Sequence, residues 1–321
     1  MQRVLVVGVP RSGTTWVGNV LARSAGATYL GEPDNHLRFA FPLRAKLRSG
    51  ERQYPALAPE REDTRIGDLR LLWENALSEE PRSGVAELRG RYANRLVELA
   101  GGMRVLRAFD DANRTSPLLT AAVALARPER PRVSAPSLVV KSVYAPLCVE
   151  WVQARHEVHV VAVIRHPRNV VSSWVELGWM NPAGPDPIVT AFDPQRAAEL
   201  SSAYDAPIPE SSRLARSTWL VAALTCALED ACRRNEKWAR VVHEDLCVRP
   251  PESFPTLAAA AGLPWSKVGD ELLEETNRPG SAYEPSRISS EMPDAWRRRL
   301  TQDQVAEIDE VLARFPLETP A

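Results

Sequence analysis

Residues 3–16 read RVLVVGVPRSGTTW, and this stretch decides the fold class of the 321-residue chain. Arg3 to Gly8 is a short run of mostly β-branched residues without polar alternation, which is typical of a buried strand in a parallel sheet. A glycine-containing turn follows, and from Thr14 to Ser24 apolar side chains recur at helical spacing. A strand, a turn and a helix in this order predict an α/β domain.

More Val-rich runs extend the pattern along the chain. Leu138 to Lys141 and Val158 to Ile164 are each followed by a helical pattern, and a third run, Arg240 to Val242, ends at His243. Strands that alternate with helices favour a doubly wound parallel sheet flanked by helices. Ligands of such sheets bind beyond the carboxyl ends of the strands.

The composition excludes several classes of protein. The 44% hydrophobic and 25% charged residues are ordinary for a globular protein. The net charge of −1 argues against an extended nucleic-acid interface. No apolar run is long enough to span a bilayer, the N-terminus does not read as a secretory signal, and the four cysteines lack metal-ligand spacing. We therefore expect a cytoplasmic enzyme with no membrane span, no nucleic-acid partner and no metal.

We expect one domain over residues 1–321, with two segments that shape an acceptor pocket. Residues 36–130 read as mostly helical, with Ser116 as the N-cap of a helix over 117–126. Residues 181–209 hold six prolines and little periodicity, which predicts a long lid loop. Three aromatic residues are possible pocket walls and equally possible core residues: Trp73, Trp179 and Phe192.

Gly8 to Thr15 has the spacing of a P-loop, in which backbone N–H groups and the positive end of a helix face an anion. The nucleotide-kinase form needs a lysine after the second glycine, but Thr14 stands there. The loop therefore predicts phosphate binding without the side chain that handles a triphosphate. A glycine-rich turn that serves packing alone is the alternative.

Arg11 to Trp16 (RSGTTW) resembles the 5′-phosphosulfate loop of the sulfotransferases that use 3′-phosphoadenosine 5′-phosphosulfate (PAPS). The resemblance implies that Trp16 packs beside the adenine, with a core aromatic as the equal alternative. It implies that Arg11 replaces the family lysine beside the departing bridging oxygen. It also implies that four backbone N–H groups bind the 5′-phosphate, those of Ser12, Gly13, Thr14 and Thr15.

Arg165 to Trp174 (RHPRNVVSSW) resembles the 3′-phosphate motif of the same family. Arg165 leaves a strand end as a bidentate phosphate fork, and Ser173 lies two helical turns further on a similar face. Alone, such a pair is usually structural, but together with the first motif it suits a nucleotide with both a 3′- and a 5′-phosphate. Arg287 precedes a segment that resembles the family's C-terminal one (AWRRRLT), which implies a contact with the 3′-phosphate.

The catalytic groups are also implied by the resemblance. Lys141 matches the lysine of the family's K-T-H segment, which holds the sulfuryl oxygens, but Val143 replaces the histidine base. Glu32 matches the glutamate base of carbohydrate-type sulfotransferases, and we expect partial burial to raise its pKa toward the working pH. His36 is the reserve base. The alternatives are a surface lysine for Lys141 and a structural loop carboxylate for Glu32.

These features predict a PAPS-dependent sulfotransferase (EC 2.8.2) with a P-loop-like fold. It transfers a sulfuryl group to a hydroxyl of a small-molecule, glycolipid or saccharide acceptor, and it releases adenosine 3′,5′-bisphosphate (PAP). One alternative is a P-loop kinase, which Thr14 disfavours. Another is a non-catalytic nucleotide-binding protein on the same fold. It is disfavoured because the chain keeps all five polar site residues: Arg11, Glu32, Lys141, Arg165 and Ser173. The sequence indicates neither the acceptor nor an oligomeric state.

Overall fold

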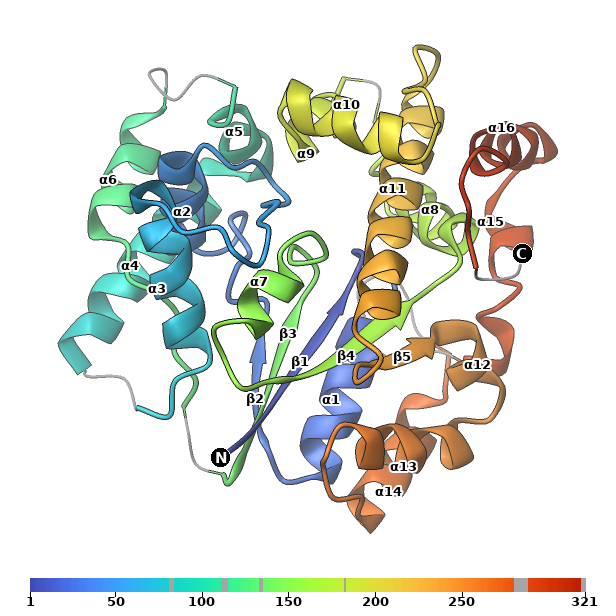
Figure 1. Ribbon diagram of the computed structural model, residues 1–321, viewed down its shortest axis with the longest axis horizontal. Helices are drawn as coiled ribbons and strands as arrows, with labels where there is room; N and C mark the ends of the chain where they lie inside the picture. Colours follow the sequence, from blue (N-terminus) through green and yellow to red (C-terminus); the bar gives the residue numbers. More distant parts are fainter. Residues whose placement is uncertain (81–83, 111–114, 133–134, 182, 280–287, 319–321) are drawn as a thin grey trace.

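The computed structural model of the protein describes residues 1–80, 84–110, 115–132, 135–181, 183–279 and 288–318. The described residues form a five-stranded sheet in the order β2-β3-β1-β4-β5, and every neighbouring pair is parallel. The strands are β1 (Gln2–Gly8), β2 (Thr28–Gly31), β3 (Ser137–Ser142), β4 (His159–Ile164) and β5 (Ala239–Val242). The predicted parallel α/β sheet is confirmed, with β1 at its centre (Figure 1).

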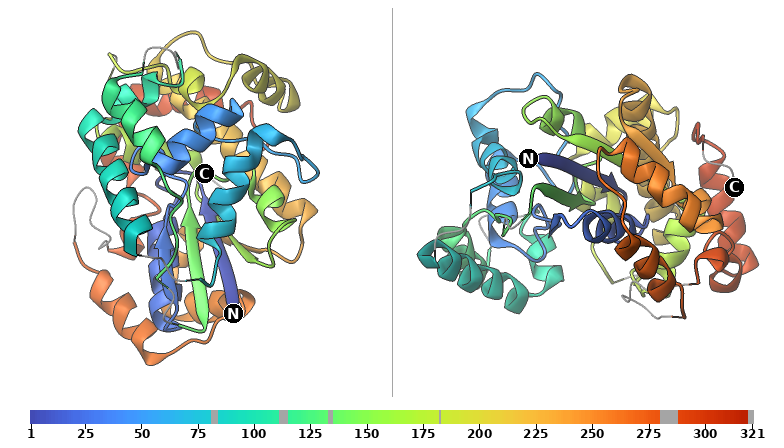
Figure 2. Two further views of the ribbon diagram at one scale, coloured as in Figure 1. Left: turned by 90° about the vertical axis from the view of Figure 1, so that its left-hand side faces the viewer. Right: turned by 90° about the horizontal axis from the view of Figure 1, so that it is seen from below.

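Both faces of this sheet are buried, because alternate residues of each strand point to opposite sides. Leu5 and Val7 belong to one apolar cluster, and Val4 and Val6 belong to another. Figure 2 shows that helices lie on both sides of the sheet. The first cluster includes α2 (Ala40–Ser49), α3 (Gly67–Ala76) and α7 (Val149–Gln153), and the second includes α1 (Thr14–Ser24), α13 (Pro250–Ala260) and α14 (Lys267–Thr276).

The region between β2 and β3 is helical, as predicted, and lies beside the β2 end of the sheet (Figure 1). In addition to α2 and α3 it contains the short η1 (Thr64–Ile66), α4 (Gly84–Ala100), α5 (Gly102–Arg107) and α6 (Pro117–Leu125). The predicted cap of α6 is confirmed, because the Ser116 hydroxyl accepts a hydrogen bond from the N–H of Leu119.

The prediction that residues 181–209 form a long loop is wrong. Pro187 and Pro194 begin two helices, α9 (Pro187–Ala191) and α10 (Pro194–Ala203), whose N-caps are Asp186 and Asp193. Proline suits the first turn of a helix because its φ is already helical and its missing N–H needs no acceptor there. Both helices join an apolar cluster with the long helix α11 (Arg213–Arg234), so most of this segment is packed.

The strand register positions the site. Gly31 of β2 pairs with Lys141 of β3, and Gly8 of β1 pairs with Val163 of β4, so four strands end along one edge. The remaining elements are α8 (Pro167–Glu176), α12 (His243–Val248), η3 (Ser289–Glu291), α15 (Trp296–Arg299) and α16 (Gln302–Leu312). Within the described ranges, no helix is long and apolar enough to cross a membrane.

Candidate active site

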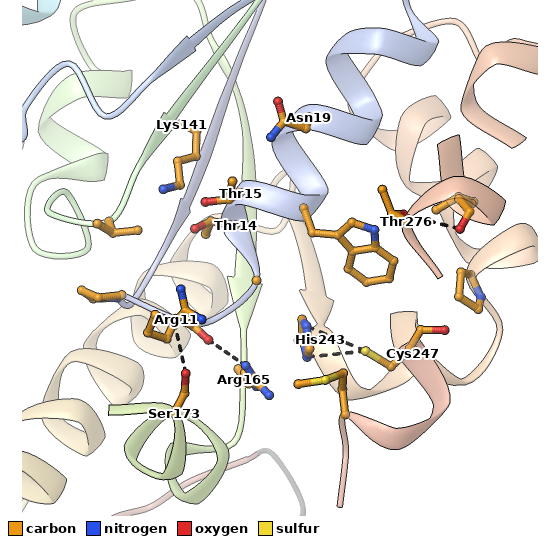
Figure 3. A pocket seen from close by; sticks show the side chains of 18 of the residues that line it. Arg11, Thr14, Thr15, Asn19, Lys141, Arg165, Ser173, His243, Cys247 and Thr276 are labelled. Carbon is orange, nitrogen blue, oxygen red and sulfur yellow. Dashed lines mark hydrogen bonds between the residues drawn. The ribbon is translucent and has the colours of Figure 1, made fainter. Parts of the chain in front are cut away.

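A cavity of about 860 Å³ lies at the carboxyl edge of the sheet (Figure 3). Its walls come from the β1–α1 loop, from the segments that follow β2, β3 and β4, and from α12 and α14. Doubly wound sheets bind their ligands at this edge, because the strand connections diverge there and leave a crevice. The sequence-predicted motifs therefore meet at one cavity.

The β1–α1 loop presents the start of α1 to this cavity. Gly13 adopts a left-handed φ of 95° and its carbonyl accepts the first helical hydrogen bond, from Val17. The N–H groups of the first helical turn have no acceptor within a helix, so they and the positive helix end can bind an anion. The side chains of Thr14 and Thr15 line the cavity beside them.

Ser12 differs from the prediction. Its N–H donates to the carbonyl of Val9 at 3.0 Å, and its side chain is buried and does not line the cavity. That hydrogen bond closes the loop and engages the Ser12 N–H. Ser12 is a residue that shapes the loop.

Two glycines in this loop are required by close packing. A Cβ on Gly13 would overlap the ring of His243, whose Nε2 would lie 2.8 Å away. A Cβ on Gly8 would lie 2.7 Å from the carbonyl oxygen of Val163 on the neighbouring strand. The loop can therefore approach β4 and α12 closely only without side chains at these two positions.

Arg165 follows β4, and its guanidinium lines the cavity with nitrogens that could donate hydrogen bonds to an anion. Its Nη1 donates to the carbonyl of Arg11 at 2.8 Å, which fixes the direction of the guanidinium. Its Nε and Nη2 are buried without a hydrogen-bond partner, although Glu244 lies 3.9 Å from Nε. A buried guanidinium with two unused donors has the geometry of a phosphate fork.

Ser173 and Arg11 complete this corner of the cavity. The Ser173 hydroxyl accepts a hydrogen bond from Arg11 Nε at 3.1 Å, as the dashed line in Figure 3 shows. Both residues line the cavity with Arg165. The structure therefore brings together the two predicted phosphate motifs through Arg11, which contacts Ser173 by its side chain and Arg165 by its carbonyl.

Trp16 and His243 form an aromatic wall beside the loop. Trp16 meets the His243 ring edge-on at 6.0 Å and the Phe254 ring at 4.8 Å, so it belongs both to the core and to the cavity lining. Burial holds the pKa of His243 well below its usual range, and Arg165 adds to this effect, so the ring is neutral. The Cys247 sulfur lies 3.7 Å from His243 Nδ1.

Glu32 and Lys141 form an ion pair on the opposite side of the loop, and both line the cavity. Burial alone would raise the pKa of Glu32, but Lys141 and a hydrogen bond from Asn35 lower it below its usual value. The prediction of a raised Glu32 pKa is therefore wrong for this state of the protein. Sequence reasoning placed both residues at the site but did not pair them.

His36, the expected reserve base, lies outside the cavity. His36 is fully buried, its Nδ1 lies 3.0 Å from Lys46 Nζ, and it does not line the cavity. Burial and the adjacent Lys46 hold its pKa well below the usual range. The structure does not support His36 as a reserve base, because no acceptor can reach it. Arg287 falls outside the described residues.

Several cavity residues were missed from the sequence. Of these missed residues, only Arg299 lies in a recognisable motif, the segment that resembles the family's C-terminal one. The other missed residues belong to no motif that the sequence shows. Of the three predicted wall residues, Trp179 lines the cavity, whereas Trp73 and Phe192 are each 2% exposed in the core. The missed residues include Asn19, Thr276, Asn277, Ser289 and Arg299.

The fold and the cavity define an α/β protein in which a P-loop-like turn and the buried guanidinium of Arg165 on a neighbouring strand line one cavity. Residues 3–267 match the family model described as the sulfotransferase family, so the chain belongs to that family. It is a sulfotransferase of the PAPS-dependent class (EC 2.8.2), as predicted, and the match decides against the kinase alternative. The comparison with curated proteins returned no match.

Among solved structures, the chain resembles the sulfotransferase domain from the curacin biosynthetic pathway, at 13% identity and a TM-score of 0.47, with 100% of this chain and 99% of that chain covered. It also resembles a sulfotransferase from Mycobacterium avium, at 12% identity and a TM-score of 0.40, covering 99% and 77%. A third is retinol dehydratase in complex with androsterone and inactive cofactor PAP, at 12% identity and a TM-score of 0.37, covering 100% and 84%.

Proposed function

We propose that the protein transfers a sulfuryl group from PAPS to the hydroxyl of a small-molecule, glycolipid or saccharide acceptor, with Glu32 as the general base. One observation carries the nucleotide assignment. Groups that can donate hydrogen bonds to an anion follow two adjacent strands: the N–H groups at the start of α1 follow β1, and Arg165 follows β4. Arg11 lies between these groups, because its carbonyl contacts Arg165 and its side chain contacts Ser173. Two such sites suit a nucleotide with phosphates on both its 5′ and 3′ positions.

The residues present fit this nucleotide. The first turn of α1 offers backbone N–H groups for a 5′-phosphate, and the two Arg165 nitrogens without hydrogen-bond partners suit a 3′-phosphate. Ser173 offers its hydroxyl to the same 3′-phosphate. Trp16 and the neutral His243 ring supply flat surfaces of the kind on which an adenine packs.

Two cations serve the reacting groups in this proposal. PAPS, when bound, supplies the sulfuryl group that is transferred. Lys141 holds the sulfuryl oxygens, and Arg11 stabilises the negative charge that develops on the leaving phosphate. Because a guanidinium does not readily release a proton, Arg11 acts by charge and hydrogen bonding only.

Glu32 accepts the proton of the acceptor hydroxyl in this proposal. In the structure Lys141 lowers the pKa of Glu32, which keeps the carboxylate ionised but makes it a weak base. When Lys141 turns toward the sulfuryl oxygens, its hold on Glu32 weakens and the carboxylate becomes more basic. The same ammonium thus governs both the transferred group and the base.

The acceptor is proposed to enter where apolar side chains line the cavity. Val143 stands two residues after Lys141, Leu37 follows the Glu32 turn, and Trp179 is 39% exposed at the wall.

The four cysteines are free and buried, which fits the reducing cytoplasm that we propose as the location.

Glu32→Gln tests the proposal, because the amide keeps the size of the side chain but cannot accept a proton. Removal of a general base typically lowers the rate about 10²- to 10⁴-fold. We expect turnover with PAPS and an acceptor panel, followed by mass spectrometry for added SO₃, to fall by at least about a hundredfold. The PAP dissociation constant and the melting temperature should stay near the wild-type values. A variant with normal turnover would show that another group is the base.

A further inference from the structure

Glu32 has an unusual backbone conformation for a residue other than glycine. Its φ is 53°, a left-handed value that non-glycine residues keep only when the surroundings hold them there. The N–H of Glu32 donates to the carbonyl of Lys141 at 2.6 Å, and the N–H of Asn35 donates to the carbonyl of Glu32 at 3.1 Å. The Asn35 amide also donates to Glu32 Oε2 at 2.6 Å. The turn is thus held locally around Glu32.

A second connection lies on the other face of β3. Successive strand residues point to opposite sides, so Lys141 faces the cavity while Ser142 faces the interior. The Ser142 hydroxyl donates to Asp34 Oδ2 at 2.6 Å, and both side chains are buried. The same hydroxyl accepts the N–H groups of Tyr144 and Ala145, at 3.0 and 3.1 Å. Two adjacent strand residues therefore hold the Glu32 turn from both faces of the sheet.

A buried lysine holds the turn from α2. Lys46 is fully buried, and its Nζ donates to the carbonyls of Asp34 and Gln53 at 3.1 and 2.9 Å. Its third polar contact is His36 Nδ1, and the ring of Tyr144 lies 4.6 Å away. Burying an ammonium is costly unless every donor has a partner, and here all three donors are used.

The side chains of Asp34, Ser142 and Lys46 do not line the cavity, so they cannot contact the substrates. We propose that Asp34, Ser142 and Lys46 are positioning residues that hold the Glu32 turn and so keep the Glu32 carboxylate beside Lys141 in the cavity. The inference rests on the proposed role of Glu32 as the base. His36, expected from the sequence as a reserve base, is then a partner of the positioning lysine.

The inference predicts a change that a loss of stability alone does not cause. The charged groups that act on Glu32 are Lys141 on β3, Arg38 after the turn, and Asp34, with Lys46 beyond it. Lys141 is the main group that lowers the Glu32 pKa. If the turn loosens, Glu32 moves away from Lys141, and the acid limb of the rate profile shifts to higher pH.

Ser142→Ala is the direct test, with Ser142→Thr as the conservative variant that keeps the hydroxyl. Because a misplacement of about 1 Å at a reacting group can cost about a hundredfold, we expect Ser142→Ala to lower kcat about tenfold to a hundredfold. The PAP dissociation constant, measured by calorimetry, should remain within about twofold. Ser142→Thr should restore kcat. Thr225→Val is the matched control, since its buried hydroxyl donates to Val221 on α11 at 2.8 Å, and it should leave kcat unchanged.

Asp34→Asn provides a second variant if Ser142→Ala folds poorly, and Glu229→Gln, another buried carboxylate, is its control. In the Glu32→Gln background, neither positioning variant should lower kcat further, because both act through Glu32. Folded single variants with wild-type kcat and an unmoved acid limb would overturn the inference. So would an undiminished effect in the Glu32→Gln background. Normal turnover of Glu32→Gln itself would instead overturn the proposed base.

Discussion

Arg165→Ala should separate the two phosphate sites. In the protein, one Arg165 nitrogen is bonded to the carbonyl of Arg11, whereas Nε and Nη2 are buried without hydrogen-bond partners. Those two donors are the ones available to a 3′-phosphate. Removing them should weaken PAP, which carries a 3′-phosphate, much more than AMP, which does not.

The magnitude follows from the two unused donors. A hydrogen bond to a charged group contributes about 1.5–3 kcal/mol, so two such bonds at the lower value give about 3 kcal/mol, or roughly 150-fold in the PAP dissociation constant. AMP should lose no more than the indirect effect of the missing bond to the Arg11 carbonyl. That bond is worth about 1 kcal/mol, or roughly fivefold.

Calorimetric titration with PAP and AMP, both without Mg²⁺, measures these two effects. Arg168→Ala, three residues further on in α8, is the matched control, because Arg168 pairs with Asp309 and stacks on Trp296 without lining the cavity. It should leave both affinities unchanged. Arg165→Lys should recover only part of the PAP affinity, because lysine keeps the charge but loses the planar fork. Equal losses for PAP and AMP in Arg165→Ala would refute the assignment and make Arg165 a structural residue.

Two further predictions concern the loop and the ion pair. Gly13→Ala should lower the melting temperature by several degrees and abolish PAP binding, because the new Cβ overlaps His243 at a φ of 95°. Adding His243→Ala should recover part of the loss, and an unchanged Gly13→Ala protein would contradict the packing argument. Lys141→Met should raise the pKa of Glu32. Carbon NMR of the protein with labelled glutamate measures this pKa, and the Glu32→Gln variant assigns the signal. Because the folded pKa of Glu32 is depressed, the stability that the pairing with Lys141 confers is fully present above the unfolded value near 4.5 and is lost as the pH falls through the lower folded value. A difference in melting temperature between the two proteins that stays constant across that range would contradict the pairing.

Motifs that are local in the chain could be recognised without a structure. Strands, glycine turns and helix starts leave periodic and positional signals within a dozen residues. These signals placed Lys141 and Arg165 at strand ends, and Thr14 and Ser173 in the helices that follow strands. In a parallel sheet, strand ends share an edge, so their meeting at one cavity was also predictable. Six prolines and little periodicity conceal the α9 and α10 helices in the sequence, because proline interrupts a helix in its interior but favours it at the first turn.

The sequence by itself therefore determined the α/β class and the presence of both predicted phosphate motifs, of Glu32 and of Lys141 at the cavity. Only the tertiary structure decided which groups pair and which are buried. Glu32 meets Lys141, and Asp34 meets Ser142, across more than a hundred residues, because Gly31 aligns with Lys141 in the sheet. Lys46 is likewise buried by a tertiary contact, because α2 brings its ammonium against the carbonyl of Asp34 in the turn that follows Glu32. A pKa depends on such partners and on burial, so the direction of the Glu32 shift could not be read from residues that are neighbours only in the chain.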